Sequence, residues 1–320
     1  MSPRRIGRDL VALVFVIILG ASSQALGKQK KSEVKKPLPK GTPVLWQEPS
    51  DLESRDLFWG PGGRAMRPDL RRVTFIKDQK GGFTTKYRVR DASGREWVAK
   101  IGKEAQSETA ATRLLWAAGY FPEVTYLAPS VNIRGKGTFE NVRFEARSKD
   151  VKRFDEWAWE DNPFMGTREL QGLKVVMVLL NNWDIKDENN VIIYAPEGGG
   201  QLRYAISDLG ATFGKAGGLF WQLTRSRNKP EDFADAKFIE GVKEGYVDFS
   251  YGGKMPELFE EITVEQARWI GGYLARLSDQ QLNDAFRAAN YTPAEVRLLT
   301  LAVRARINEL SGLAGETARP

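Results

Sequence analysis

A polar stretch between two apolar segments has the residue types that hold a divalent metal ion and accept a proton. Its sequence is Asn181-Asn182-Trp183-Asp184-Ile185-Lys186-Asp187-Glu188-Asn189-Asn190. The apolar run at 173–180 before it predicts a buried helix, and the apolar residues 191–194 after it predict a strand. After a turn at 196–200, a second strand at 202–206 ends in Asp208-Leu209-Gly210. This hairpin brings a further carboxylate back towards the polar stretch, which is a good arrangement for holding a metal ion.

The composition limits the chemistry that this stretch can perform. The chain has no Cys and no His, which excludes a Cys nucleophile, disulfides, His-based triads and most zinc sites. Any reaction must rest on Asp, Glu, Lys, Asn, Ser, Thr or Tyr. Because hard cations prefer oxygen ligands, an Asp and Asn site for Mg²⁺ or Mn²⁺ is the most natural arrangement that remains.

Length and charge set broad bounds on the fold and the partners. With 320 residues, 42% of them hydrophobic, and nine Trp, the chain can form one large domain or a two-lobed one with a sizeable core. The formal net charge is +7, but part of the excess comes from six lysines crowded between positions 28 and 40. The overall charge is therefore a weak argument for nucleic-acid binding, and we expect no nucleic-acid partner.

The first 27 residues have the pattern of an export signal. Arg4, Arg5 and Arg8 precede an apolar core at 10–19, and small residues follow at 23–27. Two interpretations stay open, a cleaved signal peptide and an uncleaved membrane anchor. We expect residues 28–43, which are rich in Lys and Pro, to form a solvated linker. The expected location is therefore periplasmic or secreted, with membrane contact only through the N-terminal segment.

Residues 44–148 predict a small β-rich lobe. Strands are expected at 73–76, 87–90, 97–101, 124–133 and 139–146. The first three should form an antiparallel meander, because a Gly-containing loop at 80–86 and a turn at 91–94 join them. One helix is expected between the third and fourth strands, with its apolar face at 110–118 and its N-cap at Ser107 or just before it.

Residues 149–312 predict a larger helical lobe, and 313–320 a frayed tail. Helices are expected at 166–180, 238–247, 264–276, 278–289 and 293–310. Thr263, Ser278 and Thr292 are the expected N-caps of the last three. A solvated loop is expected around the basic residues 225–229. The fold class is therefore α+β, with two lobes.

Three motifs, in this order, resemble those of protein kinases. Val98-Ala99-Lys100 on the third strand resembles the kinase lysine strand, and 184–189 matches the catalytic-loop pattern D-[IL]-K-x-x-N. Asp208-Leu209-Gly210 resembles the D-F-G magnesium motif, with Leu in place of Phe. The chain thus resembles the atypical protein-kinase-like superfamily over about 70–310. Within it, we expect an exported bacterial-type member similar to lipid-kinase-like and secretory-kinase-like proteins.

This resemblance implies a role for each motif in phosphoryl transfer, which depends on positioning and charge neutralisation. The residues implied are Lys100, Glu108, Gly81, Gly82 and Thr84 for ATP or another nucleotide, Asp184 and Lys186 for catalysis, and Asn189 and Asp208 for Mg²⁺ or Mn²⁺. Lys100 would hold the α- and β-phosphates, and a helix acid would orient it, either Glu108 or the alternative Glu104. Asp184 would accept the hydroxyl proton of the substrate, and Lys186 would neutralise the transferring phosphoryl group.

Several features depart from the kinase pattern. Asn182-Trp183 replaces the usual His-Arg, no A-P-E motif follows Asp208, and no G-x-G-x-x-G loop is present. The interval from Lys100 to Glu108 is short for a lysine–glutamate pair. The polar stretch also has more acids and amides than needed, so Asp187, Glu188 and Asn190 are alternative metal ligands.

Three functions are compatible with these motifs. The first is an exported phosphotransferase acting on a hydroxyl of a protein, lipid or sugar, although an exported enzyme meets little ATP. The second is a pseudokinase, or a module that binds nucleotide or metal without turnover. The retained Lys, Asp, Asn and Asp set argues against simple decay. The third is different nucleotide chemistry on the same fold, such as adenylyl transfer.

Overall fold

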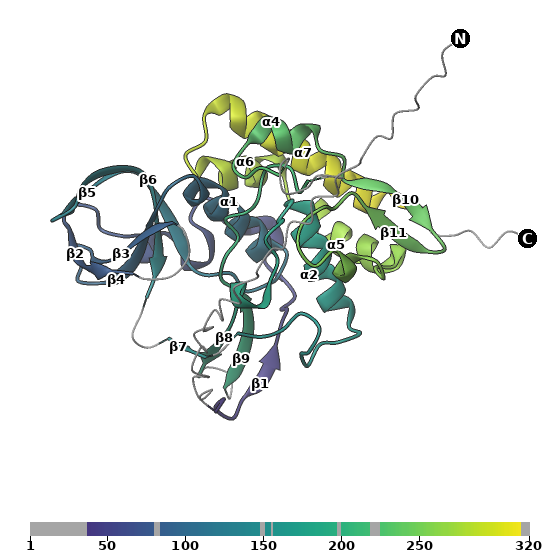
Figure 1. Ribbon diagram of the computed structural model, residues 1–320, viewed down its shortest axis with the longest axis horizontal. Coiled ribbons are helices and arrows are strands. Elements are labelled where there is room, and N and C mark those ends of the chain that lie inside the picture. Colours follow the sequence, from purple (N-terminus) through teal and green to yellow (C-terminus); the bar gives the residue numbers. More distant parts are fainter. Residues whose placement is uncertain are drawn as a thin grey trace, which may run out of the picture. The chain divides into compact units, whose positions relative to one another are not determined.

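The computed structural model describes residues 37–79, 84–147, 151–154, 156–196, 200–217 and 225–314. All of them belong to one compact unit, drawn in Figure 1. The predicted signal segment, most of the predicted linker, Gly81, Gly82 and the last six residues lie outside the described residues. Within the described ranges, no helix is long and apolar enough to cross a bilayer.

Five strands form a closed barrel, seen end-on in Figure 1. They are β2 (Val73–Asp78), β3 (Thr85–Arg90), β4 (Glu96–Ile101), β5 (Thr125–Arg134) and β6 (Gly137–Ala146). Their order is β2-β3-β4-β6-β5, and a parallel pairing of β2 with β5 closes the ring. The antiparallel meander and all five strands are as the sequence predicts. The barrel interior is apolar, with Val89, Trp97, Val142 and Phe144 buried.

Helix α1 (Glu104–Ala117) follows β4 almost directly. Only Gly102 and Lys103 separate them, and Gly102 adopts φ +132°, a conformation that favours glycine. The predicted N-cap at Ser107 is wrong, because the helix starts at Glu104 and its N-cap position is Lys103. The earlier start brings Glu104 and Glu108 onto successive turns of the same helix.

A second sheet has the order β1-β9-β8-β7. Its strands are β1 (Thr42–Val44), β7 (Lys152–Arg153), β8 (Asn190–Ala195) and β9 (Gln201–Ile206). Strands β8 and β9 are the predicted hairpin around the polar stretch. Strand β1 pairs in parallel with β9. Structured chain therefore begins by Thr42, inside the linker predicted to run to residue 43.

Helices dominate the rest of the chain, so the predicted β-rich and helical halves are confirmed. They are α2 (Arg168–Leu179), α4 (Pro230–Asp235), α5 (Val264–Ala275), α6 (Asp279–Arg287) and α7 (Pro293–Ser311). Thr263, Ser278 and Thr292 cap α5, α6 and α7, each in a capping box. Short 3₁₀ turns lie at Leu52–Ser54, Gly60–Gly62, Arg64–Met66, Asp187–Asn189 and Pro256–Phe259.

The predicted helix at 238–247 is wrong, because this segment belongs to a β-hairpin. Its strands are β10 (Ile239–Lys243) and β11 (Tyr246–Phe249), paired antiparallel. Glu244 and Gly245, the two turn residues, both have positive φ, at 53° and 81°. Two successive positive φ values fit the twist of a two-residue hairpin turn, which glycine favours.

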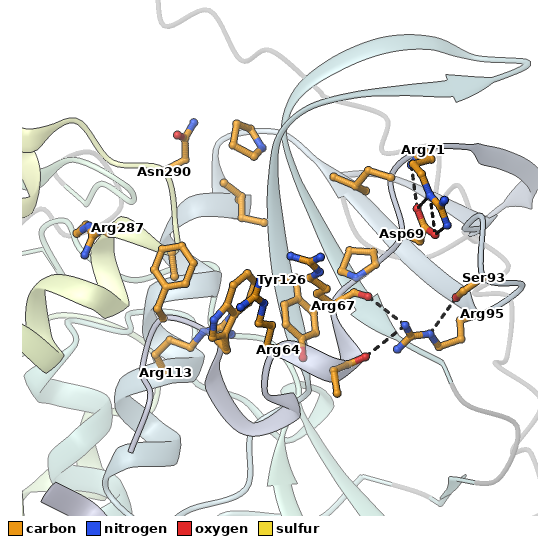
Figure 2. Close-up of a pocket in the computed structure, with 18 residues that line it drawn as sticks. Arg64, Arg67, Asp69, Arg71, Ser93, Arg95, Arg113, Tyr126, Arg287 and Asn290 are labelled. Atoms are coloured by element: carbon orange, nitrogen blue, oxygen red, sulfur yellow. Dashed lines mark hydrogen bonds and ion pairs between the residues drawn. The ribbon is translucent and has the colours of Figure 1, made fainter. Parts of the chain in front are cut away.

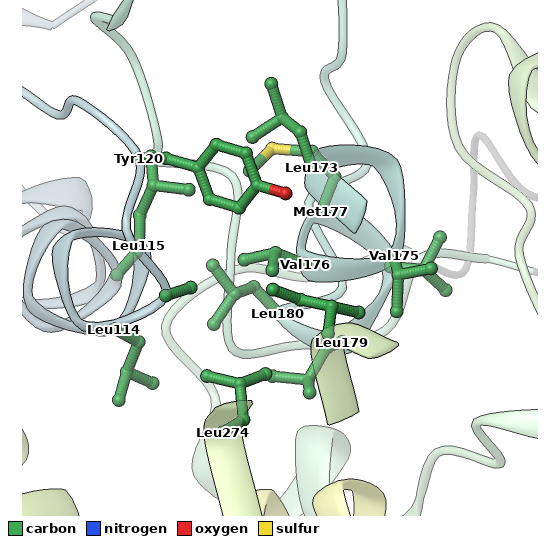
Figure 3. Packing of buried hydrophobic residues seen from close by; sticks show 14 of the residues in the cluster. Leu114, Leu115, Tyr120, Leu173, Val175, Val176, Met177, Leu179, Leu180 and Leu274 are labelled. Carbon is green, nitrogen blue, oxygen red and sulfur yellow. The ribbon is translucent and has the colours of Figure 1, made fainter. Parts of the chain in front are cut away.

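One large apolar cluster holds α1 against the helical part of the chain. Figure 3 shows side chains of one apolar cluster, to which Leu114 and Leu115 of α1, Met177 of α2 and Leu180 just beyond α2 all belong. Leu274 of α5 adds to the same cluster. Because α2 leads directly into the polar stretch at 181–190, this packing fixes both α1 and that stretch on one framework.

Candidate active site

Lys100 is the centre of a buried charge cluster. Its side chain is 1% exposed, and its Nζ lies 2.7 Å from Glu104, 2.8 Å from Glu108 and 3.5 Å from Asp208. Strand pairing determines its position, because Lys100 lies opposite Lys86 of β3 and Arg143 of β6. A buried ammonium group needs such partners, since an unpaired charge in the interior is very costly.

The lysine–glutamate pair forms in spite of its short interval. Because α1 starts directly after β4, Glu104 in its first turn and Glu108 in its second turn both lie within reach of Lys100. Glu108 is 1% exposed and also forms an ion pair with Arg143, which in turn binds Glu145 at 2.6 Å. Burial raises the pKa of Glu108, while the charges of Arg143 and Lys100 act in the opposite direction.

Asp208 reaches this cluster from the end of β9. Its Oδ1 accepts a hydrogen bond from the Gly210 amide at 3.0 Å, and the hydroxyl of Ser107 on α1 donates to the Gly210 carbonyl, also at 3.0 Å. A side chain at Gly210 would lie 2.9 Å from the Cβ of Glu104, so this position requires glycine. Burial tends to raise the pKa of Asp208, but Lys100 and the Gly210 amide outweigh it, and the net shift is downward.

Asp184 lies between two lysines. Its carboxylate is 3.3 Å from Lys186 and 2.5 Å from Lys254, and its side chain is 26% exposed. The backbone amide of Lys254 donates to the Trp183 carbonyl at 2.9 Å, which holds this second lysine beside the loop. The arrangement offers one carboxylate as proton acceptor and two ammonium groups for phosphate charge.

Asn189 joins the loop of Asp184 to the segment of Asp208. Its side-chain Nδ2 donates to the Asp184 carbonyl at 2.7 Å, and its own carbonyl accepts from the Ser207 amide at 2.8 Å. The side-chain oxygen of Asn189, Oδ1, accepts no hydrogen bond from the described residues and is available as a ligand. Asn189 and Asp208 therefore offer oxygen ligands at the same end of the β8–β9 hairpin.

Two of the alternative metal ligands have structural contacts instead. Asp187 accepts from the Trp159 amide at 3.0 Å, and Asn190 donates to the Trp157 carbonyl at 2.8 Å. Both side chains thus fix the segment before α2 against the polar stretch. Among the described residues, no group of three or more acidic side chains is arranged to hold a metal ion. An Asn and Asp pair, completed by nucleotide and water, fits what Mg²⁺ commonly receives from proteins.

The predicted nucleotide loop is only partly described. Gly81 and Gly82 lie outside the described residues, whereas Thr84 donates its hydroxyl to Glu104 at 3.0 Å. Lys86, opposite Lys100, contributes a second cation at this edge of the barrel. Its pKa is lowered, first by burial and then by repulsion from Lys100.

Arg227, in the predicted solvated loop, makes two specific contacts while its side chain stays 39% exposed. Its guanidinium forms an ion pair with Glu104 and lies 4.7 Å from the Trp183 ring centre. Glu104 therefore contacts Lys100, Thr84 and Arg227 at once. This glutamate connects the lysine strand, the end of the predicted nucleotide loop and the segment after Gly210.

Arg306 on α7 is a residue that the motif comparison missed. It is 3% exposed and donates to the carbonyls of Leu179, Phe233 and Ala236 and to the side chain of Asn181, at 2.9–3.1 Å. Asn181 begins the polar stretch in a left-handed conformation, with φ 51°. A charged residue among the buried positions Val303, Ile307 and Leu310 of α7 was the available signal.

Comparisons with known proteins give only remote matches. No family model matches the chain, and no curated protein matches it. Among solved structures, the Helicobacter pylori proinflammatory kinase CtkA matches at 10% identity and a TM-score of 0.48, over 76% of this chain and 96% of that one.

Two further kinases match at lower scores. The Rio2 kinase of Chaetomium thermophilum, solved with ADP and Mg²⁺, gives 12% identity and a TM-score of 0.31, over 76% of this chain and 73% of that one. The Golgi casein kinase, solved with Mn and ADP, gives 8% identity and a TM-score of 0.35, over 77% of this chain and 72% of that one.

The resemblance to protein kinases therefore rests on this chain's own geometry. A β-barrel with one helix presents a paired lysine and glutamate, and a helical part presents a catalytic-type loop and an Asp-Leu-Gly turn. Lys100, Glu108 and Asp208 are joined by ion pairs, and Asn189 links Asp184 to the same hairpin end. The catalytic roles of these residues stay predictions. The order of these parts and the way they meet are those expected from the motif resemblance to protein kinases.

Proposed function

We propose that the chain is a phosphotransferase that uses a nucleotide with Mg²⁺ or Mn²⁺ to phosphorylate a hydroxyl group. The observation that carries this proposal is the sharing of one buried ammonium group, Lys100 Nζ, between Glu108 at 2.8 Å and Asp208 at 3.5 Å. Here a helix acid orients the lysine while a second acid, from the other half of the chain, lies beside it at the place where metal and phosphate would meet.

Asn189 and Asp208 are the residues that would hold the metal ion. Their donor atoms are an amide and a carboxylate oxygen, which suit a hard divalent cation. When bound, such an ion neutralises the phosphate oxygens during transfer. The lowered pKa of Asp208 keeps its carboxylate ionised, and so able to serve as a ligand, at neutral pH.

The other residues divide the transfer between charge and proton handling. Lys100, and Lys86 opposite it, would hold the phosphates of the nucleotide. The bond from the terminal phosphorus to its bridging oxygen breaks, and a bond to the substrate oxygen forms. The hydroxyl proton passes to Asp184, which has a lysine on each side of its carboxylate. Lys186 and Lys254 would neutralise the negative charge of the phosphoryl group during its transfer.

A second function, nucleotide or metal binding without turnover, is favoured by one observation. Glu104 lies 2.7 Å from Lys100, closer than Asp208, and also binds Thr84 and Arg227. The Glu104 carboxylate is therefore ion-paired with Lys100, the cation that a phosphate group would need. Contact between a phosphate and Lys100 requires Glu104 to release the lysine, whereas a module that binds only a metal ion could keep this arrangement.

We also propose that the protein acts outside the cytoplasm. The support comes from the sequence alone, namely Arg4, Arg5, Arg8 and the apolar core at 10–19. A reporter enzyme that is active only after export, fused after residue 312, tests this. Activity of a cytoplasm-only reporter at the same fusion point would overturn export and would also remove the difficulty of ATP supply.

Thermal unfolding with and without nucleotide, followed by turnover, separates the two functions. We expect ATP with Mg²⁺ or Mn²⁺ to raise the melting temperature of the protein, and ADP to be released when a hydroxyl substrate is present. Lys100→Met and Asp208→Asn should abolish both effects, whereas the exposed Lys136→Met should keep them. Stabilisation without ADP release would favour the binding module, and no response to either nucleotide or metal ion would contradict both functions.

A further inference from the structure

A cavity of about 690 Å³ shares no residue with the Lys100 cluster. Its walls come from the loop 58–71, from α1, from β5 and from the end of α6. Figure 2 shows that side chains from these elements face one another around it. This volume is in the range of pockets that hold small molecules. We call this cavity the arginine pocket.

The arginine pocket has a strong excess of positive charge. Its lining includes six arginines, Arg64, Arg67, Arg71, Arg95, Arg113 and Arg287, and one acid, Asp69. The acid is already neutralised, because Asp69 binds Arg71 through both of its oxygens at 2.5–3.1 Å. Arg287 is likewise paired, with Asp284 at 2.6 Å. The other four arginines have no carboxylate within ion-pair distance in the described part of the chain.

Arg113 is the buried member of this set. It is 1% exposed, and its Nη1 donates to the hydroxyls of Thr112 and Thr125 at 3.2 and 3.1 Å. Its Nε is buried and has no hydrogen-bond acceptor among the described residues. Burial lowers the pKa of Arg113 to about 10, so the guanidinium is still charged at neutral pH. A buried cation without a carboxylate partner is costly unless an anion compensates it.

The charge of Asp56 favours the Arg113 cation but compensates it only in part, because burial prevails and the net pKa shift of Arg113 is downward. The Asp56 carboxylate accepts hydrogen bonds from the backbone amides of Phe58 and Trp59 at 3.0 and 3.1 Å. Its hydrogen bonds thus fix the loop and do not go to Arg113. Gly60, with φ +67°, lies directly against the guanidinium, where a Cβ would come within 2.7 Å of it. The chain thus makes room for this arginine without neutralising it.

The remaining arginines give the pocket a fixed wall and a charged rim. Arg95 donates to the carbonyls of Met66 and Arg67 at 2.9 and 3.1 Å, which holds the loop in place. Arg64 and Arg67 are exposed at the rim and have no acidic partner in the described ranges. An anion entering the pocket would therefore meet the exposed Arg64 and Arg67 first and the buried Arg113 last.

Aromatic side chains line the same space. Phe58 and Trp59 pack edge to face, with ring centres 4.9 Å apart, and Tyr126 lies on the opposite strand β5. Arg67 lies over the Trp59 ring at 5.8 Å. Guanidinium groups recognise phosphate oxygens by paired hydrogen bonds, and aromatic rings accept a planar or apolar group beside them.

We propose that the arginine pocket binds a phosphate monoester that carries a planar or apolar group. The phosphate of this ester provides a negatively charged partner for Arg64, Arg67 and Arg113. Its organic group packs on Phe58, Trp59 and Tyr126. The shared chemistry, a terminal phosphate on an apolar body, occurs both in soluble metabolites and in lipid headgroups. Because Arg113 lies on α1 with Glu108, this ligand would bind the same helix that orients Lys100.

Calorimetric titration of the whole protein with phenyl phosphate tests the proposal. We expect binding to the unaltered protein, at least tenfold weaker binding to Arg67→Gln and Arg113→Met, and weaker binding by inorganic phosphate, which lacks the ring. Arg72→Gln is the matched control, because Arg72 is exposed in the same loop but does not line the pocket. Arg67 is at the surface, so its variant keeps the test valid even if Arg113→Met fails to fold.

Vesicles containing phosphatidic acid form the second arm of the experiment. If phenyl phosphate binds and Arg67→Gln weakens that binding, the ligand is a soluble one. If only the vesicles bind, and Arg67→Gln weakens that binding, the ligand is a lipid headgroup. The proposal is overturned if neither probe binds, or if Arg67→Gln and Arg72→Gln bind equally. Neither result bears on phosphoryl transfer at Lys100, because the two sites share no residue.

Discussion

Lys100 and Asp208 lie 3.5 Å apart, Nζ to Oδ1, although β4 carries one and the end of β9 the other. Helix α1 accounts for this meeting. It presents Glu108 to the lysine, and its Ser107 binds the Gly210 carbonyl beside the aspartate. The two halves of the chain are therefore joined at the charge cluster itself, so a change in α1 should affect both.

The two glutamates of α1 should have opposite effects on nucleotide binding. Glu104→Gln removes the anion nearest to Lys100, so we expect the affinity for nucleotide to rise several-fold. Glu108→Gln leaves Lys100 and Arg143 without their buried carboxylate, and we expect both stability and affinity to fall. Titration with a fluorescent nucleotide, together with urea unfolding, measures both quantities. A loss of affinity in Glu104→Gln would instead make Glu104 the residue that orients the lysine.

Arg306 should act on turnover by positioning the polar stretch. Lysine cannot make the four hydrogen bonds of this guanidinium, so Arg306→Lys should lower the free energy of unfolding by about 2–3 kcal/mol. We also expect kcat to fall more than KM rises, because Asn181 leads into the loop of Asp184 and not into the nucleotide loop. Arg304→Lys is the control, since Arg304 lies on the same helix and pairs with the exposed Asp279. Equal effects of the two substitutions would show that Arg306 has no special role.

Asp91 should stabilise the barrel in a pH-dependent way. Its buried carboxylate accepts hydrogen bonds from Trp97, from Ser93 and from the backbone amides of Asp69 and Arg95. Burial tends to raise the pKa of Asp91, but these donors, first the Ser93 hydroxyl, lower it below its ordinary value. We expect Asp91→Asn to lower the free energy of unfolding by about 2–4 kcal/mol at pH 7.

The sign of the pH effect follows from the lowered pKa of Asp91. An ordinary Asp pKa is about 3.9 in the unfolded chain, so the contribution is complete above that pH and is lost as the pH falls through the folded pKa. The difference in unfolding free energy between the parent protein and Asp91→Asn should therefore shrink below about pH 4. Urea unfolding across this range measures it, with the exposed Asp78→Asn as control. A difference that stays constant with pH would contradict this account.

Local sequence patterns were sufficient to place most elements and to select the motif residues, whose catalytic roles stay predictions. Alternating apolar residues placed the barrel strands, and Thr263, Ser278 and Thr292 marked three helix starts because capping chemistry is local. The hairpin at 239–249 was missed although Glu244-Gly245 forms its turn, because the apolar residues around it also fit a helical period.

What the sequence did not reveal depends on contacts between distant parts of the chain. The parallel pairing of β2 with β5 joins Val73 to Ile133, which are 60 positions apart, and closes the barrel with no local signal. Arg113, Arg143 and Arg306 are buried, whereas arginine usually lies at the surface. The short interval between Lys100 and Glu108 argued against their pairing until the start of α1 was known.

The most direct test of the central claim is a titration with Mn²⁺ in the presence of ADP, with free Mn²⁺ followed by electron paramagnetic resonance. The account predicts one tight site per chain that Lys100→Met and Asp208→Asn each weaken at least tenfold, while Asp248→Asn, an exposed acid on β11, leaves it unchanged. The same Mn²⁺ affinity in Asp208→Asn and Asp248→Asn would contradict the claim that Lys100 and Asp208 form one metal–nucleotide site.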